Sequence, residues 1–75
     1  PLQTGVTGYS VHDLIHGYIG TVQEVITMKE QDLLKVVDQS KEVLIPAVDA
    51  FILRIDSKKK EIHTDLPEGL LDVNS

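Results

Sequence analysis

The sequence predicts an all-β domain, a small and highly curved antiparallel sheet or barrel of six short strands that ends in a short C-terminal helical turn. Three observations predict it. Apolar and polar residues alternate in several short segments. Turn-forming residues separate these segments at about eight to twelve residues. The chain has only 75 residues, and a chain of this size buries about 60% of its unfolded surface, so one thin core is expected.

The clearest element is a hairpin over residues 51–66. Its first strand, 51–56, alternates cleanly, and its inward face is expected to hold Phe51, Leu53 and Ile55. A polar tip follows at 57–60. The second strand resumes the period of two, with Ile62, Thr64 and Leu66 on one face and Glu61, His63 and Asp65 on the other.

The four earlier strands are predicted from shorter patterns at 9–13, 20–27, 32–38 and 41–48. The turns between them fall at 14–18, at the polar connection 28–31 and at Gln39–Ser40. Val22 and Val25 are out of step for a strand, which predicts a bulge between them. The third strand is apolar on both faces and should be central. Pro46 cannot donate a ladder hydrogen bond, so the fourth strand should end, bulge or lie at an edge near it.

The last segment, Leu66 to Asp72, is predicted to form one helical turn, with Pro67 early in it. The residues expected to fix the architecture are Gly20, Ile45, Pro46, Phe51, Gly69 and Leu70. Gly20 is expected at a bulge and Gly69 at the helix stop, while Leu70 is expected to cap the open end of the barrel. The predicted core consists of Val11, Val22, Val36, Ile45, Phe51, Leu53 and Ile62.

Composition narrows the classes of function. The chain has no cysteine, so it has no disulfide and no thiolate chemistry. It has no apolar run near the roughly 18 residues that a membrane helix needs, and a cytoplasmic location is expected. Its net charge is −5, with basic residues confined to 29–60, so a basic stripe for nucleic acid is missing. Lys58–Lys60 are interpreted as a solvated hairpin tip.

Histidine and carboxylate side chains are the groups from which a metal or acid–base site would be built. His12, Asp13 and His16 are close in sequence, and His63 lies elsewhere. In an extended strand, however, positions 12 and 16 are about 13 Å apart, and only a turn would bring them together. The serines lack a glycine-flanked elbow and no phosphate-binding glycine pattern is present. The sequence therefore predicts no catalytic residue, metal or cofactor.

A family resemblance rests on several segments in a fixed order. They are Val6 to Val11, Ile19 to Val25, Glu42 to Val48, Ile55-Asp56, Ile62 and Asp65 to Asp72. This order resembles the C-terminal PRC-barrel domain of the ribosome maturation factor RimM. The resemblance covers about nine-tenths of the chain and implies a barrel that follows an upstream domain. Residues 1–8 are expected to be the lead-in from that domain and 9–75 the barrel, so a chain that begins at Pro1 is expected to be a piece of a longer protein.

The resemblance also implies a function. Family members are non-enzymatic assembly factors that bind the head of the immature small ribosomal subunit, contact a basic ribosomal protein there (of the S nineteen type), and support maturation of the small-subunit ribosomal RNA. An acidic domain suits a basic protein better than bare RNA. The candidate contact residues are Glu61, Asp65, Glu68 and Asp72. Direct contact with RNA is expected to be weak or to come from the upstream domain, and the fragment is expected to be a monomer, with an edge-strand dimer left open.

Two other functions stay open at this point. The domain could belong to another PRC-barrel protein, such as an adaptor of a membrane-associated electron-transfer subunit, because a fold does not fix a function. A direct RNA-binding module is the third class, and it predicts measurable affinity for ribosomal RNA with a steep dependence on salt.

Overall fold

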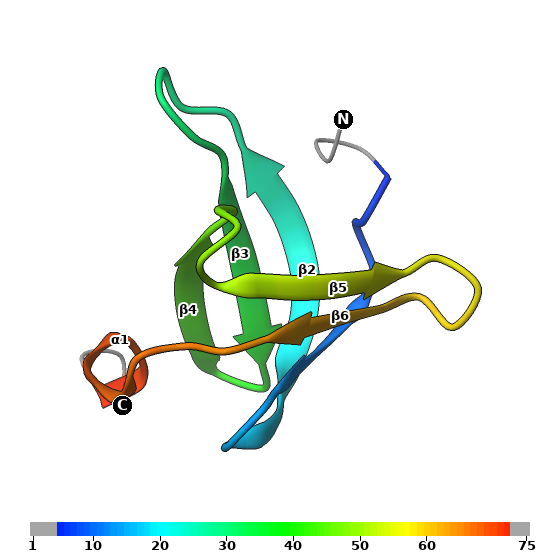
Figure 1. Ribbon diagram of the computed structural model, residues 1–75, viewed down its shortest axis with the longest axis vertical. Coiled ribbons are helices and arrows are strands. Elements are labelled where there is room, and N and C mark those ends of the chain that lie inside the picture. The colour runs from blue at the N-terminus through cyan, green and yellow to red at the C-terminus, as the bar shows by residue number, and fades with distance from the viewer. Residues whose placement is uncertain (1–4, 73–75) are drawn as a thin grey trace.

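Six strands and one short helix make up the computed structural model, which describes residues 5–72 except for the side chains of Leu71 and Asp72 (Figure 1). The elements are β1 (Ser10–Asp13), β2 (Gly17–Ile26), β3 (Leu33–Asp38), β4 (Lys41–Pro46), β5 (Ile52–Asp56), β6 (Glu61–Thr64) and α1 (Glu68–Asp72). The strands form one sheet in the order β4-β3-β2-β1-β6-β5. The predicted all-β class, the six strands and the C-terminal helical turn are confirmed.

Strand direction differs from the prediction in one place. Four of the five pairings are antiparallel, but β1 pairs with β6 in parallel, with Val11 opposite Ile62. A tight turn fixes an antiparallel pairing only between strands that follow one another, and most of the chain separates β1 from β6. The sheet curls strongly, and its hydrogen-bonded order ends at β4 and β5.

The core fills the concave side of the curled sheet. It consists of Val6, Tyr9, Val11, Val22, Leu34, Val36, Ile45, Ile62 and Leu66. In both β1 and β6 alternate residues are buried, which sends Val11 and Ile62 inward. The domain boundary expected at Tyr9 stays a prediction, and Val6, which precedes it, is buried in this core.

Bulges bend the sheet where the pattern indicated one. The β2–β3 register shifts between Val22 and Glu24, at the predicted bulge. A second shift, between Val11 and His12, lies opposite Gly20. A Cβ atom at Gly20 would meet the carbonyl oxygen of Val37 and would lie 2.8 Å from its carbonyl carbon. Gly20 is therefore required by the close approach of β2 to β3.

The inward face predicted for β5 is wrong at one position. Leu53 is 52% exposed, whereas Phe51, Ile52 and Ile55 are partly buried against the core. Phe51 also precedes the strand instead of lying within it. The reason is a register shift between Ile52 and Arg54, which adds a residue and breaks the period of two.

The ends of β4 and α1 test two further predictions, one about Pro46 and one about Gly69. β4 is an edge strand that ends at Pro46, as the missing N–H required. Gly69 is not a helix stop: it lies inside α1, its Cβ position is open, and the helix continues to Asp72. Leu70, one residue later, is partly buried and packs against the core. Within residues 5–72, no helix has the length and apolar character that crossing a membrane requires.

Candidate binding surface

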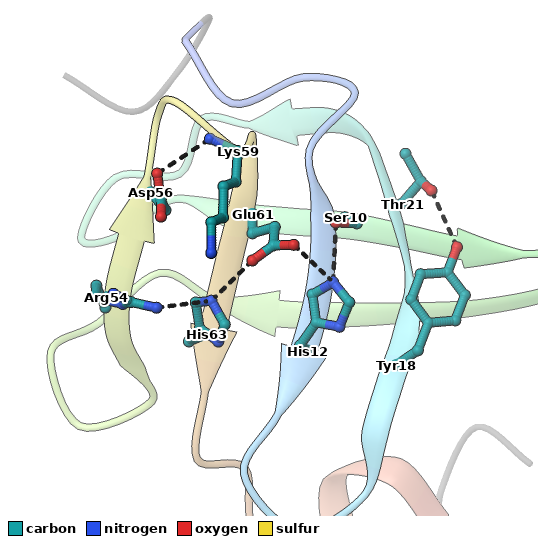
Figure 2. Close-up of polar contacts among 9 residues, drawn as sticks. All are labelled: Ser10, His12, Tyr18, Thr21, Arg54, Asp56, Lys59, Glu61 and His63. Atoms are coloured by element: carbon teal, nitrogen blue, oxygen red, sulfur yellow. Dashed lines mark hydrogen bonds and ion pairs between the residues drawn. The ribbon is translucent and has the colours of Figure 1, made fainter.

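Four side chains on the convex side of the sheet lie in one row across four neighbouring strands (Figure 2). The register places Tyr18 of β2 beside His12 of β1, His12 beside His63 of β6, and His63 beside Arg54 of β5. We call Tyr18, His12, His63 and Arg54 the ring row. Its members come from both ends of the sequence, and only the pairing of β1 with β6 brings them together.

The rings of this row are close and partly open to solvent. The ring centroids of Tyr18 and His12 are 5.7 Å apart, and those of His12 and His63 are 5.8 Å apart with an angle of 26° between the ring planes. Tyr18 is 52% exposed. The side chains of His12 and His63 are 35% and 31% exposed. Figure 2 shows the broad faces of the Tyr18 and His12 rings in front of the strands.

A second row of polar residues supports the rings, two positions along β1, β5 and β6 and three positions along β2, which is bulged there. It holds Thr21, Ser10, Glu61 and Asp56. Oε1 of Glu61 lies 3.2 Å from Nε2 of His63, and its Oε2 lies 4.0 Å from Nε2 of His12. The hydroxyl groups of Tyr18 and Thr21 are 3.2 Å apart. These contacts help to fix the ring orientations.

The imidazole of His63 has two competing partners. Its Nε2 is 3.2 Å from Nη2 of Arg54 and 3.2 Å from Oε1 of Glu61. Without a hydrogen, Nε2 accepts from Arg54; with one, it donates to Glu61. It cannot do both at once, so either Arg54 or Glu61 lacks this hydrogen bond and can bind another partner.

Asp13 is part of the structure beneath this surface and is not a ligand on it. Its buried carboxylate accepts hydrogen bonds from the Thr64 hydroxyl at 3.0 Å and from the N–H of Leu66 at 2.8 Å. The N–H groups of Ile15 and His16 donate to its other oxygen. Burial alone would raise the pKa of Asp13, but these four hydrogen bonds outweigh it and hold the pKa below its ordinary value of 3.8.

The structure separates the three residues of the candidate metal site. His12 points outward in the ring row, Asp13 points inward, and His16 is exposed in the β1–β2 turn. Among the described side chains, those of residues 5–70, no three from His, Cys, Asp or Glu converge as metal ligands would. The β1–β2 turn instead exposes two aliphatic side chains, Leu14 (69%) and Ile15 (73%).

The four predicted contact residues do not form one cluster. Glu61 starts β6 and is partly buried between two histidines, whereas Asp65 and Glu68 are exposed beyond the other end of that strand. Figure 1 shows β6 running from the β5–β6 turn toward α1, so these carboxylates are strung along one direction. The side chain of Asp72 lies outside the described part. We call Asp65, Glu68 and Asp72 the acidic end.

Basic residues gather at the opposite end of β6. Four of the seven Lys and Arg residues, Arg54 and Lys58–Lys60, belong to the β5–β6 hairpin. The carboxylate of Asp56 accepts the N–H of Lys58 at 3.0 Å and that of Lys59 at 3.1 Å. These two hydrogen bonds, of which the one from Lys59 has the larger effect, hold the pKa of Asp56 below its ordinary value. The hairpin tip is thus a formed turn that presents its lysines on a defined backbone.

A shallow hollow lies away from this chemistry. It measures about 310 Å³ and is lined by residues 28–31 and Leu33, all from the β2–β3 connection and its edge. None of the ring row or of the acidic end contributes to it. The hollow is therefore separate from the ring row and the acidic end.

Sequence reasoning missed the ring row. His12 and His63 each occupy an outward position in an alternating segment, and that signal was present. What was missing was their neighbourhood, since a parallel pairing between the first and last strands leaves no local trace in the sequence.

Fold and surface together define a small curled β-domain of the PRC-barrel type, whose polar features lie on its outer face and at its two ends. The family model described as the RimM PRC barrel domain matches residues 5–70. The chain belongs to the RimM PRC-barrel family.

Relatives agree with this assignment. Ribosome maturation factor RimM from Bacteroides fragilis is 43% identical over 89% of this chain and 37% of its own length. The RimM of Flavobacterium psychrophilum is 35% identical over 91% of this chain and 39% of its own. The chain therefore spans less than two fifths of these relatives. A crystal structure of a Pseudomonas aeruginosa protein described as a 16S ribosomal RNA processing protein, RimM, superimposes with a TM-score of 0.76 over 87% of this chain and 43% of that one. At 21% identity, that likeness concerns the fold.

Proposed function

We propose that this chain is the docking domain of a ribosome maturation factor that binds the head of the immature small ribosomal subunit through a basic ribosomal protein of the S nineteen type, and so supports processing of the small-subunit ribosomal RNA. The observation that carries the proposal is the family match over residues 5–70. The proposal places the protein in the cytoplasm, where subunits are assembled.

The acidic end is the part of the surface that supports a basic partner. Asp65 and Glu68 are exposed, and no Lys or Arg follows Lys60 in the sequence. Such a concentration of one charge steers an oppositely charged protein and raises the association rate more than the affinity. Glu61 contributes less, because its carboxylate already faces His12 and His63.

A binding role without catalysis agrees with the chemistry of the described residues. The two carboxyl groups whose pKa values are clearly lowered, Asp13 and Asp56, accept backbone hydrogen bonds in turns. Such shifts are typical of structural carboxylates. We therefore propose that the domain acts by positioning, as an assembly factor.

The test measures association of the chain with purified head proteins of the small subunit. The variant Asp65→Lys/Glu68→Lys/Asp72→Lys reverses the acidic end. Its control, Glu30→Lys/Asp38→Lys/Asp49→Lys, changes the net charge equally at exposed positions elsewhere. We expect the first variant to lower the association rate for the basic protein and to flatten its dependence on salt, with little effect of the control. Equal loss in both variants, or no loss in either at low salt, would show that the acidic end is not the docking surface.

A further inference from the structure

We propose that the ring row and the adjoining β5–β6 hairpin bind a single strand of RNA, with unpaired bases stacked on Tyr18, His12 and His63 and phosphates held by the hairpin lysines. This is a second surface, separate from the acidic end. The choice of RNA over DNA rests on the proposed function, while the single-stranded chemistry rests on the surface itself.

The rings supply the first argument. Three rings from adjacent strands lie side by side at centroid distances of 5.7 and 5.8 Å, each partly open to solvent. A sheet that carries exposed rings on neighbouring strands is an arrangement that proteins use to stack two or three unpaired bases. Stacking needs a π-face from the base and little else, so it tolerates different sequences.

Charge complementarity supplies the second argument. Residues 54–60 carry four basic side chains against one carboxylate, Asp56, which accepts the N–H groups of Lys58 and Lys59. Figure 2 shows the Lys59 side chain extending over the same face, toward Glu61 and His63. Lys35 is different, because it lies 3.7 Å from Glu24 and 3.8 Å from Glu42. Four of the seven basic residues, Arg54 and Lys58–Lys60, therefore stand next to the rings in a domain with a net charge of −5.

The polar second row adds groups that read base edges. The Glu61 carboxylate accepts from base amino groups, and the hydroxyls of Ser10 and Thr21 donate or accept. The exchangeable partner of His63 lets Arg54 or Glu61 turn to a base without leaving a polar atom unpaired. A duplex cannot use this face, since its bases are already paired and stacked.

The sequence predicted weak direct contact with RNA, and the reason for the difference is local. Net charge averages the acidic end with the hairpin, whereas a strand of RNA responds to the charges within about 10 Å of it at ordinary salt. The sequence alone indicates only a solvated hairpin tip for these lysines. In the structure they lie beside the ring row, where the proposal gives them the role of binding phosphates.

The stacking part of the proposal is tested by anisotropy of a fluorescently labelled short single-stranded RNA, its duplex and the DNA strand of the same sequence. Single-stranded RNA is expected to bind best. Tyr18→Ala and His63→Ala should each weaken binding by about fivefold to a hundredfold. Tyr18→Phe keeps the ring and should keep the affinity, as should Met28→Ala, which removes an exposed side chain elsewhere. Melting curves establish that each variant is folded.

The charge part uses a matched pair of double variants. Lys58→Gln/Lys59→Gln should lower the slope of log K against log salt by about 1.4, as expected for the loss of two phosphate contacts to a single strand. Lys29→Gln/Lys41→Gln makes the same change in net charge away from the rings and should leave the slope nearly unchanged. Lys60 is kept, because its positive φ of 57° belongs to the turn.

The following outcomes of these experiments would contradict the inference. Equal affinity for the duplex, equal effects of the two lysine pairs, or unchanged binding in Tyr18→Ala and His63→Ala would overturn the inference. Equal affinity for DNA would overturn the choice of RNA. If Tyr18→Ala abolishes capture of a ribosomal protein while RNA does not bind, the face is a protein-docking site and the inference fails. Reversal of the acidic end tests the proposed function separately, since it should impair protein binding and spare RNA binding.

Discussion

Strands β1 and β6 each have one face that packs in the core and one face that is partly open to solvent. Inward, they place Val11, Asp13, Ile62 and Thr64, all at most 5% exposed. Outward, they place Ser10, His12, Glu61 and His63, all partly exposed. Alternate residues of these two paired four-residue strands thus point either into the buried core or onto the solvent-exposed surface.

The two faces differ most in how their polar groups are satisfied. Inside, the Asp13 carboxylate has four dedicated donors, and no buried polar atom in the described side chains, those of residues 5–70, lacks a partner. Outside, the Nε2 atom of His63 is shared between Arg54 and Glu61. The comparison teaches that stability is concentrated on the inner face and adaptability on the outer one.

The largest expected effect tests the inner face directly. Ile62→Ala should cost about 2–5 kcal/mol, because the side chain is 0% exposed and its removal leaves a cavity. A domain of this size has a total stability of only about 5 kcal/mol, so the variant should be largely unfolded by urea or thermal denaturation. The matched control is Leu53→Ala on β5, where the side chain is 52% exposed. A similar loss in both variants would contradict the assigned faces.

The next effect concerns two glycines that should respond with opposite signs. Gly20→Ala should destabilise the domain by more than about 1 kcal/mol, because the new methyl group would press against the Val37 carbonyl. Gly69→Ala meets no atom and should stabilise α1 by up to about 1 kcal/mol. Chemical denaturation of both variants checks this. Destabilisation at Gly69 would contradict the open space around its Cβ position.

The third effect depends on pH. Asp13→Asn should cost about 1–3 kcal/mol at neutral pH, because one buried acceptor becomes a donor. The pKa of Asp13 is lower in the folded state than in the unfolded one, so its stabilisation is complete above the unfolded pKa and is lost as pH falls through the folded pKa. The difference in unfolding free energy between wild type and variant should therefore shrink below about pH 4. A constant difference across that range would contradict the role of the ionised carboxylate.

The smallest effect on stability belongs to the outer face. His63→Ala removes a ring that is 31% exposed and whose contacts compete with one another, so it should change stability by less than about 1 kcal/mol. Urea denaturation at neutral pH measures this. A loss as large as that of Ile62→Ala would erase the distinction between the faces.

The two ends of β6 give a second contrast that follows from the first. The β5–β6 hairpin gathers basic residues, and the chain beyond β6 gathers acidic ones, although neither end belongs to the core. A domain with a net charge of −5 thus carries two surfaces of opposite sign. This supports separate partners at the two ends, a basic protein at one and an RNA strand at the other.

The sequence determined much of this protein by itself. Alternation, β-branched residues and turn signals identified the strands and predicted Val11, Val22 and Ile62 in the core, and the missing N–H of Pro46 ended the edge strand there, because side-chain period and backbone chemistry are local properties. Only the tertiary structure decided the parallel β1–β6 pairing and the bulge that exposes Leu53. Contacts between segments some fifty residues apart depend on how the whole sheet curls. That curl created the ring row, which no local pattern records.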